Sequence, residues 1–370
     1  MSTIALRLQT PLPETYTAAL PADLEERIQE AKQSLGSNLV ILGHHYQRDD
    51  VIQWADARGD SFKLARFAAD HPAAKYIVFC GVHFMAESAD ILTGDNQHVM
   101  LPDLNAGCSM ADMANEDQVL DAWDDLSAIC GTEHIVPITY MNSSAALKAF
   151  VGEHGGAVCT SSNAEAILRW AFHTRKAEKV LFFPDQHLGR NTAVNLGFST
   201  KDCVVWNPRA ENGGLEEREI KEATFLLWRG HCSIHQRFRV AQIEEARQKN
   251  PDVHIIVHPE CAHEVVCAAD QAGSTEAIIK AIATAPAGTS WGVGTEIHLV
   301  HRLAQEHPDK QVFSLDPVSC PCSTMARIDP SHLAWTLEHL QADQIVNEIR
   351  VDPDTTRWAR TALKRMLAIT

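Results

Sequence analysis

The sequence predicts an α/β fold of three similar Rossmann-like αβα domains, with parallel sheets in a pseudo-threefold arrangement around a central active site. Three observations predict it. Short apolar runs alternate with helical patterns along the chain. A polar triplet followed by a hydroxyl residue occurs once in each third of the chain. Each third then ends on a strand-like run and a cysteine.

The apolar runs have the length and composition of buried parallel strands. They are residues 39–42, 76–79, 135–138, 180–183, 255–257 and 311–313. Helical patterns separate these strands. The first helical pattern extends from Leu24 to Leu35 and ends before Gly36. This alternation is typical of βαβ units, whose sheets are covered by helices on both faces.

The polar triplets follow one strand in each third of the chain. They are His44-His45-Tyr46, Tyr140-Met141-Asn142 and His258-Pro259-Glu260. A hydroxyl residue follows each triplet at a similar distance, and we interpret these residues as helix N-caps: Ser61, Ser161 and Thr275. A single Ser or Thr cap is most often structural. Three caps in the same relation to three triplets indicate a triplicated unit.

The repeat predicts how the chain divides. We expect an N-terminal arm (1–23), three α/β repeats (24–112, 113–240 and 241–340) and a C-terminal helical segment that packs on the body (341–370). The middle repeat has extra residues around 152–156 and 212–222, which we interpret as surface insertions. Ligands on parallel sheets bind beyond the carboxyl ends of the strands, where helix N-termini favour carboxylate or phosphate. Three such units around one centre would bring three anion-binding helix starts together.

Three cysteines end the three repeats in glycine- or proline-containing loops: Cys108, Cys232 and Cys320. Three thiolates suit an iron–sulfur cluster with one iron left open, which can act as a Lewis acid. A catalytic zinc with three protein ligands is the alternative metal. Cys322 competes for the last position, and we favour Cys320 because it precedes Pro321.

The triplets supply groups for anchoring and proton transfer. His44 and His258 can bind carboxylate or shuttle protons, and Glu260 is a candidate general base. Tyr46, Tyr140, Asn142 and His235 can donate hydrogen bonds to a substrate. Each of them alone could equally be a structural residue. Residues 292–296, GVGTE, form a lone glycine turn that is too weak a motif to indicate a dinucleotide site.

The composition excludes several classes of protein. Hydrophobic residues make up 45% and charged residues 22%, as in ordinary globular proteins. A formal net charge of −16 argues against a nucleic-acid-binding surface. We expect no membrane span, because no apolar run approaches the necessary length, and no signal peptide at the N-terminus. These features predict a cytoplasmic protein whose ten cysteines are reduced thiols.

Several longer runs resemble the quinolinate synthase family and occur in that family's order from about residue 40 to 330. Among them are LGHHYQRDDV, GDSFKLARFA, LPDLNAGCSMADM, YMNSSAALKA, FFPDQHLGRN, WRGHCSIHQRF, HPECAHEVV and CPCSTM. The resemblance implies three α/β domains around a central cavity. It also implies a four-iron, four-sulfur cluster held by Cys108, Cys232 and Cys320. The family condenses iminoaspartate with dihydroxyacetone phosphate, losing phosphate and water, to form quinolinate on the route to NAD.

The same resemblance assigns roles to individual residues. Substrate-binding positions fall on His44, Ser61, Tyr140, Asn142, Ser161, His235 and Thr275, and catalytic positions on Tyr46, His258 and Glu260. An aspartate oxidase or dehydrogenase that supplies the unstable iminoaspartate is an expected partner, and the chain is expected to be a monomer or homodimer. Two alternatives from other classes are an iron–sulfur redox sensor or electron-transfer protein, and a zinc-dependent lyase.

Overall fold

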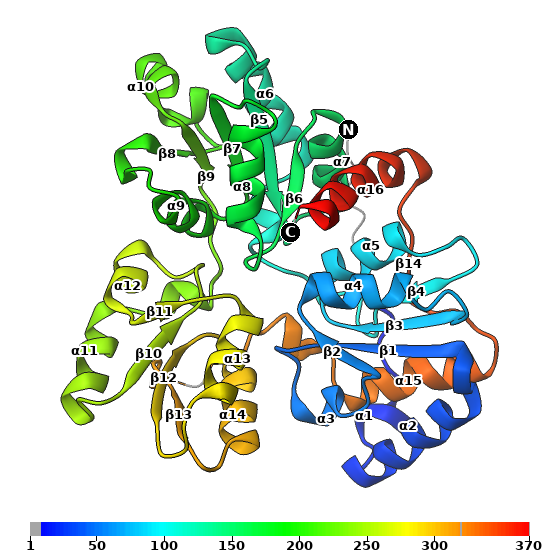
Figure 1. Ribbon diagram of the computed structural model, residues 1–370. Coiled ribbons are helices and arrows are strands. Elements are labelled where there is room, and N and C mark those ends of the chain that lie inside the picture. Colours follow the sequence, from blue (N-terminus) through cyan, green and yellow to red (C-terminus); the bar gives the residue numbers. More distant parts are fainter. Residues whose placement is uncertain (1–8, 319, 370) are drawn as a thin grey trace. The chain divides into compact units, whose positions relative to one another are not determined.

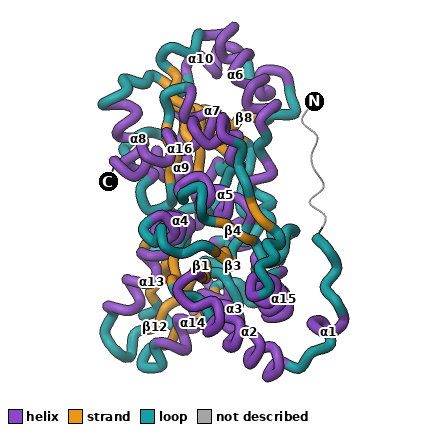
Figure 2. Tube along the Cα trace, turned by 90° about the vertical axis from the view of Figure 1, so that its right-hand side faces the viewer, coloured by secondary structure: helices purple, strands orange, loops and turns teal. Residues whose placement is uncertain are grey.

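The computed structural model describes residues 9–318 and 320–369, which form two compact units. The first unit contains the chain up to Cys108 together with Pro321–Val351. The second unit contains Ser109–Cys320 together with the chain from Asp352 onward. One sheet lies in the first unit and two lie in the second, and helices cover both faces of each sheet (Figures 1 and 2). Residues 1–8 of the predicted arm lie outside the described residues.

The sheet of the first unit has the strand order β14-β4-β3-β1-β2. Its strands are β1 (Leu39–His44), β2 (Ala57–Gly59), β3 (Tyr76–Cys80), β4 (His98–Met100) and β14 (Glu348–Ile349). All pairs are parallel except β14 with β4. The helices are α1 (Glu14–Thr17), α2 (Pro21–Leu35), α3 (Asp49–Ile52), α4 (Ser61–Ala69), α5 (His83–Leu92) and α15 (Pro330–Gln341).

The second sheet, in the second unit, is wholly parallel with the order β6-β5-β7-β9-β8. Its strands are β5 (Ile135–Tyr140), β6 (Ala157–Cys159), β7 (Lys179–Phe183), β8 (Cys203–Trp206) and β9 (Phe225–Trp228). The helices around it are α6 (Glu116–Cys130), α7 (Ala145–Glu153), α8 (Ala164–His173), α9 (Gln186–Asn195), α10 (Glu217–Glu222) and α16 (Pro353–Ala368).

The third sheet is also parallel, with the order β11-β10-β12-β13. Its strands are β10 (His254–Val257), β11 (Gln271–Ala272), β12 (Ser290–Gly294) and β13 (Gln311–Ser314). The helices are α11 (Val240–Lys249), α12 (His263–Ala268), α13 (Thr275–Thr284) and α14 (Ile297–Glu306). Its central strands β10 and β12 are buried apart from the exposed first residue of β10, His254.

The three sheets confirm the predicted fold class of three Rossmann-like parallel-sheet units. All six predicted strands are present, and the central residues of five of them are buried, whereas the residues of β13 are exposed or half-buried. Strand residues such as Ile41, Val78 and Leu181 have no exposed surface, as expected for sheets covered on both faces. The arrangement of the three sheets with their helices around one centre stays a prediction, as do the boundaries of the three predicted repeats.

One predicted surface insertion is wrong. Gly152 and Gly156 are buried, and a Cβ on Gly152 would lie 2.0 Å from the carbonyl oxygen of Trp358 in α16. Arg365 of α16 donates hydrogen bonds to the carbonyl oxygens of both glycines. Gly152 therefore allows α16 to pack closely on α7, whereas Gly156 allows a close approach to Pro137, because a Cβ there would lie 1.8 Å from the Pro137 carbonyl oxygen. Residues 212–222, in contrast, are mostly exposed.

The C-terminal segment is not purely helical. Its residues Glu348–Ile349 form the antiparallel edge strand β14, and α16 then packs against α7 and β6 in the second unit. In the described part of the chain, no helix is both long and apolar enough to span a membrane.

Candidate functional site

The triplets occupy the same structural position in all three sheets. His44 ends β1, Tyr140 ends β5, and His258 directly follows β10. In each sheet the next strand pairs in parallel with the strand that bears the triplet, and its helix begins within a few residues. The hydroxyl residues Ser61, Ser161 and Thr275 lie in these connections. Polar groups thus gather at the carboxyl ends of the strands, where parallel sheets bind ligands.

The interpretation of these hydroxyls as N-caps is wrong. The cap of α4 is Asp60, whose side chain accepts a hydrogen bond from Lys63 N, and the cap of α13 is Ser274. Ser61 and Thr275 are the first helical residues, and Ser161 lies in the turn before α8. Ser61 and Thr275 therefore lie in the first turn of a helix, whose backbone N–H groups have no intrahelical acceptors.

In the first unit, His44 is buried and its Nδ1 accepts a hydrogen bond from Tyr46 N at 3.1 Å. The two rings meet edge to face, with centroids 4.9 Å apart. Tyr46 is half-buried and Ser61 is buried. The backbone pairing of His44 with Gly59 places both triplet and helix start at one end of the sheet.

In the second unit, the Glu260 carboxylate is the centre of a buried hydrogen-bond network. The Tyr140 hydroxyl donates to Oε1 at 2.6 Å, and His235 Nδ1 lies 2.9 Å from Oε2. The ring of His258 stacks on that of His235, with centroids 4.4 Å apart. Glu260 is 3% exposed, His235 1% and His258 2%. A carboxylate removed from water in this way needs such donors.

This environment determines the protonation of the network. Burial alone would raise the pKa of Glu260, but His235, His258 and the Tyr140 hydrogen bond outweigh it and hold the pKa below its ordinary value. Burial lowers the pKa of His258 to about 3, although the negative charge of Glu260 opposes this shift. Glu260 is therefore an ionised carboxylate and His258 a neutral imidazole at physiological pH.

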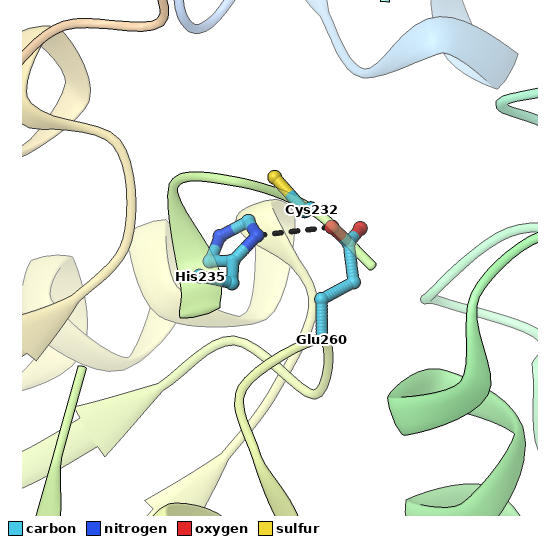
Figure 3. A group of neighbouring side chains, drawn as sticks. All are labelled: Cys232, His235 and Glu260. Carbon is cyan, nitrogen blue, oxygen red and sulfur yellow. Dashed lines mark hydrogen bonds and ion pairs between the residues drawn. The ribbon is translucent and has the colours of Figure 1, made fainter. Parts of the chain in front are cut away.

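Cys232 lies beside this network. Its Sγ, a ring nitrogen of His235 and a carboxylate oxygen of Glu260 all lie within 4.8 Å of one another. Figure 3 shows the three side chains turned toward a common point. The loop that carries Cys232 approaches Pro184 closely, since a Cβ on Gly230 would lie 2.2 Å from the Pro184 carbonyl oxygen. Gly230 therefore permits the backbone path that places the thiol here.

The other predicted metal ligands lie in comparable loops. Cys320 lines a small cavity with Ile234 and Arg237, which belong to the segment that follows Cys232. Cys108 is half-buried at the end of the first segment of the first unit. Cys322 belongs to the first unit, and its Sγ lies 3.5 Å from Thr324 Oγ1. All ten cysteines are described, and none of them forms a disulfide.

The remaining predicted residues of the second unit have different surroundings. Asn142 and Ser161 are half-buried near the ends of β5 and β6, and Thr275 is buried at the start of α13. Tyr140, His235, His258 and Glu260 are thus the predicted residues that the structure joins into one network.

Sequence reasoning missed three residues around Glu260. Thr295 Oγ1 lies 3.3 Å from His235 Nε2. Asn191 donates its side-chain amide to the carbonyl oxygens of Pro259 and Cys261, on either side of Glu260. Asp185 is fully buried and caps α9 through Leu188 N at 2.7 Å.

Asp185 is electrostatically unusual. Burial and the nearby negative charge of Glu260 raise its pKa well above the ordinary value, although backbone N–H groups oppose the shift. Its Oδ2 has no hydrogen-bond partner among the described residues. A signal for it existed in the run FFPDQHLGRN, because a polar residue directly after a buried strand lies at the ligand-binding edge of the sheet.

Comparisons with known proteins agree with this picture. The sequence model of the family described as "Quinolinate synthetase A protein" matches residues 26–368. The quinolinate synthase of Streptomyces coelicolor is 59% identical over 350 residues, which cover 94% of this chain and 88% of that protein. That of Corynebacterium glutamicum is 57% identical over 98% of this chain and 91% of the relative. The quinolinate synthase of Bacillus mycoides is 53% identical over 97% of both chains.

Proposed function

This chain belongs to the quinolinate synthetase A family, and we propose that it synthesises quinolinate for NAD biosynthesis from iminoaspartate and dihydroxyacetone phosphate. Phosphate and water are the leaving products of this condensation. The observation that supports this activity most directly is the buried, ionised Glu260 with its fixed donors Tyr140 and His235, beside the thiol of Cys232.

Glu260 is our candidate for the general base. An ionised carboxylate held by a phenol and an imidazole can accept a proton from a carbon or nitrogen of the bound substrate and return it at a later step. Tyr140 and His235 keep its two oxygens in place. His258 is neutral, so it can donate from one ring nitrogen and accept at the other. We assign Tyr46 a second proton-transfer role, after its position in the matching triplet.

The hydroxyl residues are our candidates for anion binding. Ser61, Ser161 and Thr275 lie at or just before helix starts, where backbone N–H groups and the helix dipole favour carboxylate and phosphate. His44 and Asn142, from the triplets of the first two sheets, are further candidate donors to carboxylate or phosphate. Both proposed substrates are dianions, so several such sites are needed.

The family implies an iron–sulfur cluster, and the thiols fit it. Cys108, Cys232 and Cys320 are half-buried cysteines in loops, and none of them forms a disulfide. When bound through three thiolates, a four-iron, four-sulfur cluster supplies an open iron that acts as a Lewis acid toward a substrate oxygen. Cys232 and Cys320 both flank the segment 234–237, which supports their common role.

One observation favours a second metal. Cys232, His235 and Glu260 provide sulfur, nitrogen and oxygen donors within 4.8 Å of one another, which is a donor set that also suits zinc. The hydrogen bond between His235 and Glu260 already uses two of these donor atoms. We therefore rank a zinc-dependent lyase below the iron–sulfur enzyme.

Anaerobic purification followed by metal and sulfide analysis tests the cofactor. We expect about four iron and four sulfide per chain and a brown absorption band, whereas stoichiometric zinc in a colourless protein would support the second candidate. The same sample, supplied with dihydroxyacetone phosphate and freshly generated iminoaspartate, should produce quinolinate. Full turnover after a chelator has removed the iron would contradict the proposal.

Glu260→Gln tests the base while preserving shape. We expect kcat to fall by about 10²- to 10⁴-fold with iron content unchanged. The matched control is Glu264→Gln, at an exposed position four residues later, which should retain activity. Equal activities of the two variants would exclude Glu260 as the base.

Two further assignments rest on the proposed function. Iminoaspartate is unstable in water, so an aspartate oxidase or dehydrogenase is a fitting partner that would deliver it. We also propose a cytoplasmic location, which suits reduced thiols and small metabolites as substrates. Size-exclusion chromatography with light scattering would distinguish monomer from homodimer.

A further inference from the structure

A buried asparagine joins α9 to the turn that carries Glu260. Asn191 lies on α9, which contacts α12 (Figure 1), and its side chain is only 2% exposed. Its Nδ2 lies 2.8 Å from Pro259 O and 3.0 Å from Cys261 O. The two hydrogens of one amide therefore bind carbonyl groups on both sides of Glu260. A helix of the second sheet is in this way attached to a turn of the third.

The surroundings of Asn191 determine which way its amide faces. Carbonyl oxygens accept hydrogen bonds only, so the opposite orientation would place the amide oxygen against the oxygens of Pro259 and Cys261. Water cannot relieve such a contact at so small an exposure. The amide oxygen therefore faces the other way, where His263 Nδ1 donates to it at 2.8 Å. Both N–H groups and the oxygen of Asn191 have partners, and these partners fix the orientation of its side chain.

Asn191 can restrain the turn because α9 is itself held against the second sheet. The helix begins at its cap Asp185, whose carboxylate accepts a hydrogen bond from Leu188 N at 2.7 Å. A Cβ on Gly189 would lie 2.7 Å from Leu227 Cδ2, so glycine at this position lets α9 approach β9 closely. The contact between α9 and the turn therefore has one end that is fixed by packing.

The turn that carries Glu260 has a conformational freedom that this contact removes. The turn runs from His258 to Cys261 and is closed by a hydrogen bond from Cys261 N to His258 O at 3.0 Å. Its central peptide joins Pro259 to Glu260, and the types of β-turn differ chiefly in the orientation of this peptide. Because Asn191 binds Pro259 O, it holds the central peptide in one orientation. The direction in which the Glu260 side chain leaves the backbone is fixed with it.

We propose that Asn191 is a positioning residue, which holds the turn that orients the Glu260 carboxylate toward the substrate, and that His263 fixes Asn191. Tyr140 and His235 hold the carboxylate oxygens, whereas Asn191 holds the backbone from which the side chain extends. A base must stay within about 0.5 Å of its productive place, and hydrogen bonds to the surrounding backbone provide this precision. The inference rests on the proposed function, since it takes Glu260 as the base.

Amide hydrogen exchange of the anaerobic, iron-loaded protein tests the turn without an assay of activity. In Asn191→Ala two carbonyl oxygens beside Glu260 lose their donor, so we expect amides of residues 260–262 to exchange about tenfold faster, with β5 amides unchanged. Asn195→Ala, at an exposed position one turn later on α9, is the matched control and should behave as the unmodified protein. Unchanged exchange of residues 260–262 in Asn191→Ala would overturn the proposal.

His263→Ala is a milder second variant, because it removes only the partner of the Asn191 oxygen. We expect a smaller increase of exchange at the same amides of residues 260–262. This variant decides the question if Asn191→Ala also exchanges faster in β5, which would indicate a general loss of structure. Unchanged exchange of residues 260–262 in His263→Ala would then count against the proposal.

Steady-state kinetics tests whether the turn matters for the reaction. We expect Asn191→Ala to lower kcat about 10- to 100-fold and to leave KM within about twofold, because the effect falls on the base. In a Glu260→Gln background the same substitution should change kcat by less than about twofold, since the group that Asn191 positions is gone. Equal fold losses in the two backgrounds would exclude a role through Glu260. If the unmodified enzyme formed no quinolinate, the proposed function would fail, and hydrogen exchange would still decide whether Asn191 holds the turn.

Discussion

The hydroxyl of Tyr140 lies 2.6 Å from the carboxylate of Glu260, although the two residues are 120 positions apart in the chain. Tyr140 ends β5, an interior strand of the second sheet, and Glu260 follows β10 of the third. Two triplets that the sequence identifies separately thus meet at one carboxylate. A third segment contributes His235, so the position of Glu260 depends on the fold of the whole second unit.

Tyr140→Phe removes the donor to Oε1 and preserves the ring. A hydrogen bond to a charged group contributes about 1.5–3 kcal/mol, so we expect kcat/KM to fall by roughly 10- to 100-fold. The pKa of Glu260 should rise, which moves the acid limb of the pH–rate profile to higher pH. Steady-state quinolinate formation across pH measures both effects.

Tyr76→Phe is the matched control for this prediction. Its hydroxyl donates to Asp343, a largely exposed aspartate in the first unit, at 3.2 Å. We expect its activity to stay within about twofold of the unmodified enzyme. If Tyr140→Phe also kept full activity, the Tyr140–Glu260 hydrogen bond would have no catalytic role.

Buried histidines make the fold sensitive to acid. The pKa of His258 is lowered to about 3 and that of His187 to about 4, in both cases mainly by burial. The unfolded chain binds these protons near pH 6.5, so stability is complete above that pH and falls as pH decreases toward 4. Each histidine contributes a slope of at most about 1.4 kcal/mol per pH unit.

Urea unfolding of iron-free protein at pH 7.5, 6.0 and 5.0 measures this dependence without a contribution from iron loss. The raised pKa of Asp185 opposes this trend, because that carboxyl group holds its proton more tightly in the folded protein, so the histidine contribution is read from a variant. His258→Asn lacks one of the titrating groups, and we expect the unmodified protein to lose more unfolding free energy than His258→Asn as pH falls from 7.5 to 5.0. A difference between the two proteins that stayed constant over this range would contradict the neutral, buried state of the His258 ring.

The choice between Cys320 and Cys322 can be tested by iron content. Cys320 lies in the second unit, in the same small cavity as two residues that follow Cys232. Cys322 lies in the first unit beside Thr324. We expect Cys320→Ser to lose the iron and the brown colour after anaerobic purification, and Cys322→Ser to retain both. The reverse result would transfer the ligand to Cys322.

The repeat could be predicted from the sequence because its signals are local. An apolar run followed by a polar residue marks the end of a buried strand, and His44, Tyr140 and His258 all occupy such ends. The N-caps could not be assigned in the same way. Asp60 and Ser274 directly precede Ser61 and Thr275, and neighbouring polar residues of this kind cannot be ranked without the backbone conformation.

The missed residues have roles that depend on tertiary contacts. Asn191 is a helical residue whose partners, Pro259 and Cys261, come from another sheet. Thr295 belongs to a run that resembles a glycine turn but continues the buried strand β12. The packing role of Gly152 could not be predicted for the same reason. Glycine is needed there because of α16, a helix more than 200 residues later in the chain.

Asp185 provides a test of a buried carboxyl group whose pKa is raised by burial. Asp185→Asn keeps a side-chain oxygen that can cap Leu188 and introduces no charge, so we expect a change in unfolding free energy within about 1 kcal/mol. Asp185→Ala loses the cap and should cost about 1–2 kcal/mol. Urea unfolding compares the two variants. Equal losses in both would indicate that the charge of Asp185 stabilises the fold.

The contact between α7 and α16 gives the last prediction. In Gly152→Ala the new Cβ would lie 2.0 Å from the carbonyl oxygen of Trp358, so α16 must move away from α7. Alanine favours a helix by about 1 kcal/mol over glycine, but overpacking costs about 1–3 kcal/mol or more. We therefore expect a net loss of stability in urea unfolding and faster proteolysis of α16. Gly94→Ala is the control, because its Cβ would meet only Gln97 Oε1 at 3.9 Å. If both variants were equally stable, α16 would not depend on close backbone approach at Gly152.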